Sequence, residues 1–173
     1  MAPMATALIT GGTAGLGRGF AEALAQEGHD LVLVARNEVR LRETADELYQ
    51  QYGVAVEVLP ADLVDRQQRA GVEERLRDRA LPVDLVVNNA GIGLKQHFVG
   101  GDLDAEQMML DLLVTAPMRL THAAVGGMVE RCRGYIITSV RWPASSAPAA
   151  TPRPRRISRC SPRRCPRSRT APA

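Results

Sequence analysis

The chain has 173 residues, of which 45% are hydrophobic, and this composition excludes a protein that is disordered throughout. Its net charge of +3 hides two regions of opposite sign, because eight of the 22 basic residues lie between Arg153 and Arg169 and leave 14 against all 19 acidic residues in 1–150. The acidic body therefore lacks the charge pattern of a nucleic-acid-binding domain, and nucleic acid is not expected as its partner.

The cysteines and the apolar runs place the chain in a reducing compartment. Cys132, Cys160 and Cys165 are odd in number and lack the paired spacing of a metal site. No signal peptide or long apolar run precedes the body. We expect a cytoplasmic protein with no membrane association and no bound metal.

Short apolar runs alternate with helical stretches along the body. Such alternation is typical of an α/β fold, here a Rossmann-like, doubly wound parallel sheet that is incomplete at about five strands. Ligands of such sheets bind at the carboxyl ends of the strands. The predicted strands are 5–10, 30–35, 54–59, 83–87 and 134–138, and the predicted helices are 16–26, 38–52, 66–79 and 105–131.

A glycine-rich turn follows the first predicted strand and opens the first helix. Glycines are needed where a side chain would collide with a phosphate or with the sheet, and the amino end of the helix attracts an anion. A tight turn without a ligand would show a similar run of glycines. The residues predicted to bind a dinucleotide here are Thr10, Gly11, Gly12, Thr13, Gly15, Leu16 and Gly17.

Polar residues also follow the second and third strands. Arg36 stands where an acid would bind a ribose 2′-hydroxyl and where a guanidinium would pair with a 2′-phosphate, so NADP(H) is favoured over NAD(H). A solvated surface charge is the alternative for Arg36. Asp62, followed by Leu63, is placed to accept a hydrogen bond from the adenine amino group, although it would also suit a turn.

The fourth strand is followed by Asn88, Asn89, Ala90 and Gly91. Small residues at this position permit backbone contact with a cofactor, and the asparagine side chains can connect neighbouring strand ends. We expect all four to belong to the cofactor site.

These motifs together resemble the short-chain dehydrogenase/reductase family. That family has a Thr-Gly-x-x-x-Gly-x-Gly turn, an Asp after the third strand and Asn-Asn-Ala-Gly after the fourth, and here they appear in the same order. The stretch 114–121 with Gly127-Met128 also resembles the long interface helix of the family. The likeness covers about residues 5 to 139 and implies hydride transfer between NAD(P) and a small-molecule carbonyl or secondary alcohol. It further implies a homo-oligomer, whose interface would be incomplete here.

The resemblance also implies a catalytic Ser, Tyr and Lys with a supporting Asn, and the chain departs from this pattern. The Tyr and Lys should stand four residues apart on one helix, but the last Tyr is Tyr135 and the only Lys is Lys95. Leu113 occupies the position of the Asn. Ser139 lies one or two places before the expected Ser, so it is either a catalytic candidate or a hydroxyl at the end of a strand.

The segment 140–173 differs from the body, which we expect to form an NAD(P)-binding domain over 1–139. From Pro143 onward it has no acidic residue and holds seven of the eleven prolines, so we expect an irregular tail. We hypothesise a one-nucleotide frameshift near codons 138–140, because the other frame permits a Tyr, three small residues and a Lys across 150–155. The alternatives are a cofactor-binding protein without activity and a functional arginine-rich tail that binds RNA or acidic partners.

Overall fold

The computed structural model describes residues 5–139. Contacts divide the chain into two units, Met1–Arg141 and Trp142–Ala173, and the architecture below is that of the described part of the first unit. The predicted arginine- and proline-rich tail lies outside the described residues.

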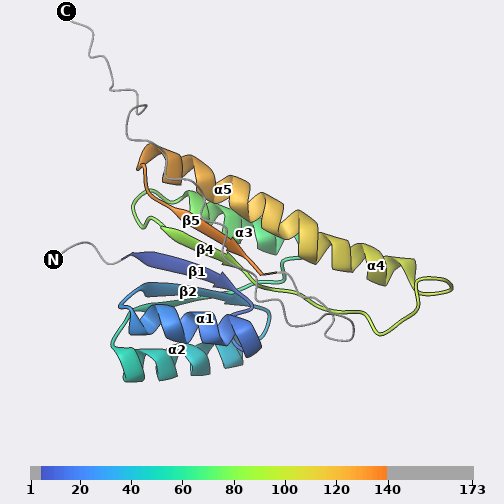
Figure 1. Cartoon of the computed structure of the whole chain (residues 1–173), viewed down its shortest axis with the longest axis horizontal. Helices are drawn as coiled ribbons and strands as arrows, with labels where there is room; N and C mark the ends of the chain where they lie inside the picture. The colour runs from blue at the N-terminus through green and yellow to red at the C-terminus, as the bar shows by residue number, and fades with distance from the viewer. Residues whose placement is uncertain (1–4, 140–173) are drawn as a thin grey trace, which may run out of the picture. The chain divides into compact units, whose positions relative to one another are not determined.

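A parallel sheet of five strands forms the centre of this unit, in the order β3-β2-β1-β4-β5 (Figure 1). The order reverses between β1 and β4, which is where ligands of doubly wound sheets bind. The predicted α/β, Rossmann-like class is therefore confirmed, with strand ends that differ from the prediction by one or two residues. The strands are β1 (Thr6–Thr10), β2 (Asp30–Ala35), β3 (Val56–Pro60), β4 (Leu85–Asn88) and β5 (Tyr135–Thr138).

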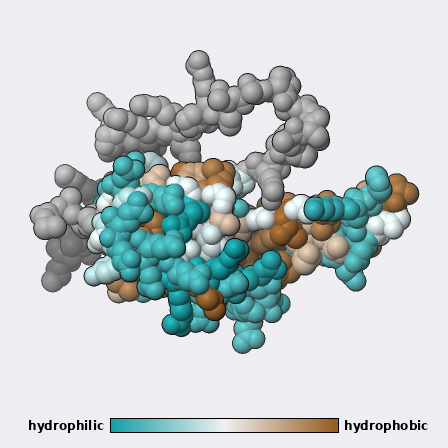
Figure 2. Space-filling model, turned by 90° about the horizontal axis from the view of Figure 1, so that it is seen from below, coloured by the Kyte–Doolittle hydropathy of each residue, from teal (hydrophilic) through white to brown (hydrophobic). Residues whose placement is uncertain are grey.

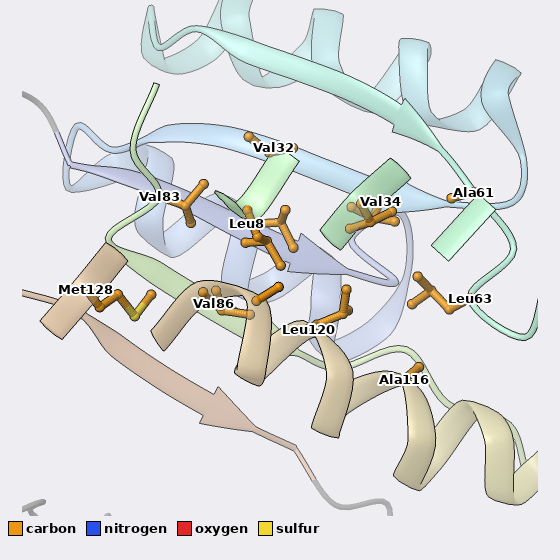
Figure 3. Close-up of a cluster of buried hydrophobic side chains, with 14 residues drawn as sticks. Leu8, Val32, Val34, Ala61, Leu63, Val83, Val86, Ala116, Leu120 and Met128 are labelled. Carbon is orange, nitrogen blue, oxygen red and sulfur yellow. The ribbon is translucent and has the colours of Figure 1, made fainter. Parts of the chain in front are cut away.

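Helices cover both faces of the sheet, with α1 and α2 on one side and α3 and α5 on the other (Figure 1). Successive residues of a strand point to opposite faces, so Leu8 packs with the α3 and α5 side while Ala7 and Ile9 pack with the α1 and α2 side. Figure 3 shows the first of these clusters, in which Val86 and Leu120 meet Leu8 from β4 and α5. The helices are α1 (Gly15–Gln26), α2 (Glu38–Tyr52), α3 (Arg66–Arg77), α4 (Leu103–Leu110) and α5 (Ala116–Glu130).

Local chemistry fixes the ends of the helices around the sheet. The side chain of Asn37 accepts a hydrogen bond from Arg40 N at the start of α2, and Gly53 ends this helix in the left-handed conformation. Asp65 caps α3 in the same way, by accepting from Gln68 N. The caps at Asn37 and Asp65 set the points at which the chain leaves the carboxyl end of the sheet, and Gly53 sets the point at which it turns back into β3.

The single long helix predicted over 105–131 is interrupted by a π-helical segment, η1 (Asp111–Thr115). Pro117 lies in the first turn of α5, and it has no N–H with which to donate to residue 113. The wider turn, in which Ala116 N donates to Asp111 O, avoids the clash that its ring would make in an α-helix. Leu112 and Leu113 of this segment lie beside the strand ends.

Candidate functional site

A cleft of about 690 Å³ lies at the carboxyl ends of the strands, at the point where the strand order reverses. This volume is in the range of small-molecule sites, about 300–1,000 Å³. Most of the residues predicted from the sequence line it, although they come from five separate strand ends. They are Gly11, Thr13, Gly15, Leu16, Arg36, Asp62, Leu63, Asn89, Ala90, Gly91 and Ser139.

Four other predicted residues, Thr10, Gly12, Gly17 and Asn88, are not among the lining residues. Thr10 and Asn88 are buried at the ends of β1 and β4, at 2% and 3% exposure. A Cβ on Gly12 would meet the side chain of Leu33 at 2.9 Å. The sequence motif includes these residues because they are packed beneath the cleft. The motif does not distinguish them from the residues that face the cleft.

The glycine-rich turn leaves room for a ligand above it. Gly11 and Gly15 have φ angles of +69° and +54°, which glycine adopts at no steric cost. A Cβ on Gly15 would meet nothing within 4 Å, whereas one on Gly17 would overlap Gly11 O and Asn89 Nδ2. The turn is therefore packed tightly below and is open above, at the amino end of α1.

No side chain of the described residues caps α1, so its first N–H groups remain available at the turn. These donors and the positive end of the helix dipole suit a diphosphate, and the open space above Gly15 permits its close approach. The turn therefore fits a dinucleotide.

At one end of the cleft, Arg36 and Arg40 carry positive charge. Sequence reasoning missed Arg40, although it lies one helical turn after Arg36, with Asn37 between them. Among the described residues, neither guanidinium has a hydrogen bond or an ion pair. Arg42 on α2, by contrast, pairs with Glu38. Two unpaired guanidinium groups at the amino end of α2 suit a phosphate.

Asp62 serves the turn that follows β3 and also lines the cleft. One oxygen of its carboxylate accepts from Val64 N at 3.0 Å, as expected for a turn residue. The residue is half-buried, and within the described residues its second oxygen has no hydrogen bond. The structural role and the predicted contact with adenine are therefore compatible.

A buried arginine holds this turn in place. Arg69, which is 7% exposed, donates from Nη1 to Leu63 O at 2.9 Å and to Val64 O at 3.3 Å.

A second buried charge, Glu73 on α3, is 3% exposed and accepts from Arg119 on α5 at 2.6 Å. The hydrogen bond from Arg119 keeps the pKa of Glu73 below its usual value despite burial. Sequence reasoning missed this arrangement, because its members are ordinary charged residues on helices.

Hydrogen bonds join the ends of β1, β4 and β5. Asn89 Nδ2 donates to Thr10 O at 3.2 Å and to Gly11 O at 3.4 Å, and Ser139 Oγ donates to Asn89 Oδ1 at 3.0 Å. Thr10 Oγ1 accepts from the backbone N–H groups of Asn89 and Ala90. Asn88 instead donates to Thr121 on α5. The predicted connection between neighbouring strand ends is confirmed for Asn89, whereas the Asn88 side chain connects β4 to α5.

The other end of the cleft is apolar apart from Ser139 and Asn89. Ile92, Met108, Leu112 and Leu113 line it, and Leu113 packs against Gly91. Neither a Tyr nor a Lys is among the described residues that line the cleft. This end can hold an uncharged group beside the Ser139 hydroxyl.

One helix of the described residues, Leu103–Glu130, is long and apolar enough to cross a membrane. A helix of a protein core passes the same test, and α5 contributes Leu120, Ala124 and Met128 to the core. Its length and composition are weak evidence for a membrane span.

Comparison with known proteins identifies the family of this chain. The family model described as short chain dehydrogenase matches residues 5–146, and the chain belongs to this family. A very-long-chain 3-oxoacyl-CoA reductase from Anas platyrhynchos is 32% identical over 142 residues, which are 77% of this chain and 44% of that protein.

Solved structures agree with this membership. A short-chain dehydrogenase from Sphingobium yanoikuyae in complex with NADPH is 41% identical, with a TM-score of 0.75 over 78% of this chain and 52% of that one. L-sorbose reductase from Gluconobacter frateurii, complexed with NADPH and L-sorbose, is 36% identical, with a TM-score of 0.74 over 78% and 51%. The chain spans about half the length of these relatives.

Proposed function

We propose that this chain binds NADP(H) in preference to NAD(H), as part of an oxidoreductase that reduces a carbonyl or oxidises a secondary alcohol. The observation that carries the proposal is the pair of unpaired guanidinium groups, Arg36 and Arg40, at one end of a cleft whose middle is the open glycine turn. Relatives solved with NADPH support the same choice of coenzyme.

Each part of the cleft would hold one part of the coenzyme. The turn from Gly11 to Gly17 and the amino end of α1 would bind the diphosphate, and Asp62 would bind the adenine. Arg36 and Arg40 would bind the 2′-phosphate through charge-assisted hydrogen bonds. NAD(H) has no group for them to bind, so the two coenzymes should differ in affinity.

When bound, the nicotinamide supplies or accepts the hydride. The chain contributes an apolar wall around Leu113 and a hydroxyl at Ser139, which could orient a substrate oxygen. The sequence contains no Tyr and Lys four residues apart, and Tyr135 is 71% exposed on β5. We infer that proton transfer to the substrate oxygen is impaired in this chain.

A coenzyme-binding protein without activity is the second candidate, and Leu113 in place of the supporting Asn favours it. Titration with NADPH and an assay with a simple ketone separate the possibilities. Binding without turnover supports impairment, turnover at a rate usual for the family contradicts it, and failure to bind contradicts both candidates.

The origin of the impairment is tested on the coding DNA. A frameshift requires a Tyr codon that spans Ala150 and Thr151 and a Lys codon that spans Pro154 and Arg155 in the shifted frame. If either codon is missing, the frameshift proposal fails. A tail that binds RNA more strongly than a scrambled peptide, in a salt-dependent way, would instead support the arginine-rich alternative.

Self-association in the cytoplasm is also proposed. Figure 2 shows apolar surface on the part of the molecule that carries α4, and the exposed apolar side chains there include Leu103 at 75% and Leu110 at 51%. Val114 and Met118 continue the patch onto η1 and α5, at 57% and 61%. A concentration-dependent mass in sedimentation experiments would support an oligomer, and a monomer at all concentrations would contradict it.

A further inference from the structure

The amide of Asn89 connects the two functional ends of the cleft. Its Oδ1 accepts the hydroxyl hydrogen of Ser139 at 3.0 Å, while its Nδ2 donates to the carbonyl groups of Thr10 and Gly11. The planar amide of Asn89 therefore contacts both the turn that precedes α1 and Ser139, which directly follows β5.

Glycine makes this position possible. A Cβ on Gly17 would overlap Nδ2 of Asn89, and a Cβ on Gly11 would lie 3.2 Å from the same atom. The amide thus occupies the space beneath the turn, where its hydrogen bonds help to hold the backbone around Gly11. The lack of a side chain at Gly17 makes room for Asn89 as well as for the close packing of α1.

The backbone of Asn89 is fixed independently of its side chain. Its N–H donates to Thr10 Oγ1 at 2.9 Å, and the N–H of Ala90 donates to the same oxygen at 3.0 Å. The remaining freedom is rotation of the amide, whose two ends move together because the group is planar. The hydrogen bond from the Ser139 hydroxyl fixes Oδ1 of the amide, and it therefore also restricts the movement of Nδ2.

We propose that Asn89 is a positioning residue that couples Ser139 to the glycine-rich turn, so that the Ser139 hydroxyl raises the affinity for a dinucleotide that it does not need to touch. The inference rests on the proposed binding of NADP(H). Without the hydroxyl, the amide can rotate away from Thr10 O and Gly11 O, and the turn is less well organised for the diphosphate. Because such coupling is reciprocal, a bound dinucleotide strengthens the hydrogen bond between Ser139 and Asn89.

The test is a double-mutant cycle in the full chain, in which the dissociation constant for NADPH is measured for each variant. A hydrogen bond of this kind predicts that Ser139→Ala weakens binding about threefold, within the usual range for one bond. Ser139→Thr keeps a hydroxyl and should bind as the unmodified chain does. Thr138→Ala is the matched control, because Thr138 is exposed and its side chain has no hydrogen bond within the described residues.

The decisive comparison repeats Ser139→Ala in an Asn89→Ala background. If Ser139 acts through Asn89, the threefold effect disappears there. An equal effect in both backgrounds, or no effect of Ser139→Ala in the unmodified chain, overturns the proposal. If the unmodified chain binds neither NADPH nor NADH, the proposed function itself fails, which is a distinguishable result.

A second measurement covers the case in which Asn89→Ala does not fold. Hydrogen exchange of the Asn89 side-chain amide, followed by NMR, should become faster in Ser139→Ala and remain slow in Ser139→Thr. Unchanged exchange in Ser139→Ala overturns the coupling.

Discussion

The two ends of the cleft differ in how completely the described residues build them. At the dinucleotide end, the turn, the amino end of α1 and two guanidinium groups present donors to an anion, and hydrogen bonds from Asn89 hold the turn from below. At the opposite end, apolar side chains such as Leu113 surround one hydroxyl, that of Ser139. We infer that coenzyme binding and proton transfer depend mainly on different strand ends.

The largest expected effect comes from filling the space beneath the turn. Gly17→Ala places a Cβ against Gly11 O and Asn89 Nδ2, so the turn must shift, and we expect NADPH binding to weaken roughly 100-fold. Gly19→Ala is the control, since a Cβ there meets nothing within 4 Å and alanine favours the helix by about 0.5–1 kcal/mol. Equal affinities of the two variants for NADPH would show that the turn does not bind the coenzyme.

The next effect should separate the two coenzymes. Arg36→Ala removes a partner of the 2′-phosphate, and we expect NADPH to bind roughly tenfold more weakly while NADH is unaffected. Arg42→Ala removes the same charge from a nearby residue on α2 that is paired with Glu38, so it should leave both affinities nearly unchanged. An equal loss for NADPH and NADH in Arg36→Ala would contradict the phosphate contact.

A smaller loss of NADPH affinity is expected when the turn beneath the proposed adenine site loses its buried support, Arg69. Arg69→Met removes the hydrogen bonds to Leu63 O and Val64 O, and we expect the free energy of unfolding to fall by about 2 kcal/mol and NADPH to bind about threefold more weakly. Thermal unfolding and titration measure the two quantities. Arg77→Met, on the exposed side of α3, serves as the control, and an equal loss of NADPH affinity in it would exclude a specific role for Arg69.

The smallest effect is a dependence of stability on pH. The pKa of Glu73 in the folded protein lies below its usual value of about 4.5, because Arg119 and Arg77 donate to the carboxylate. This contribution to stability is present above pH 4.5 and is lost as the pH falls through the lowered pKa. Glu73→Gln should reduce the free energy of unfolding by about 1 kcal/mol at pH 7 and weaken its acid dependence. Denaturant titrations of both proteins from pH 7 to pH 3 test this, and parallel curves would contradict it.

Much of the fold could be predicted because its signals are local. The apolar runs of the strands and the helix over 38–52 reflect nearby residues, whereas the strand order was not predicted, because it depends on pairing between strands far apart in the chain. The π-helical segment was missed, since the sequence rules for helix interiors give Pro117 as a possible kink without giving its geometry.

The site was predictable to the extent that glycine and strand-end positions reveal it. The sequence identified Gly15, Arg36 and Asp62, all of which line the cleft. It could not identify Arg40 or Arg69, because an arginine on a helix has the same pattern whether it faces a ligand, a buried carbonyl or solvent. Only the tertiary structure distinguishes these cases.

Titration of the purified full chain with NADPH and NADH tests the central claim most directly. Binding at the carboxyl ends of β1, β2 and β4 predicts saturable association with one equivalent of NADPH, and a higher dissociation constant for NADH. A folded chain that shows no saturable binding of either coenzyme would contradict the claim.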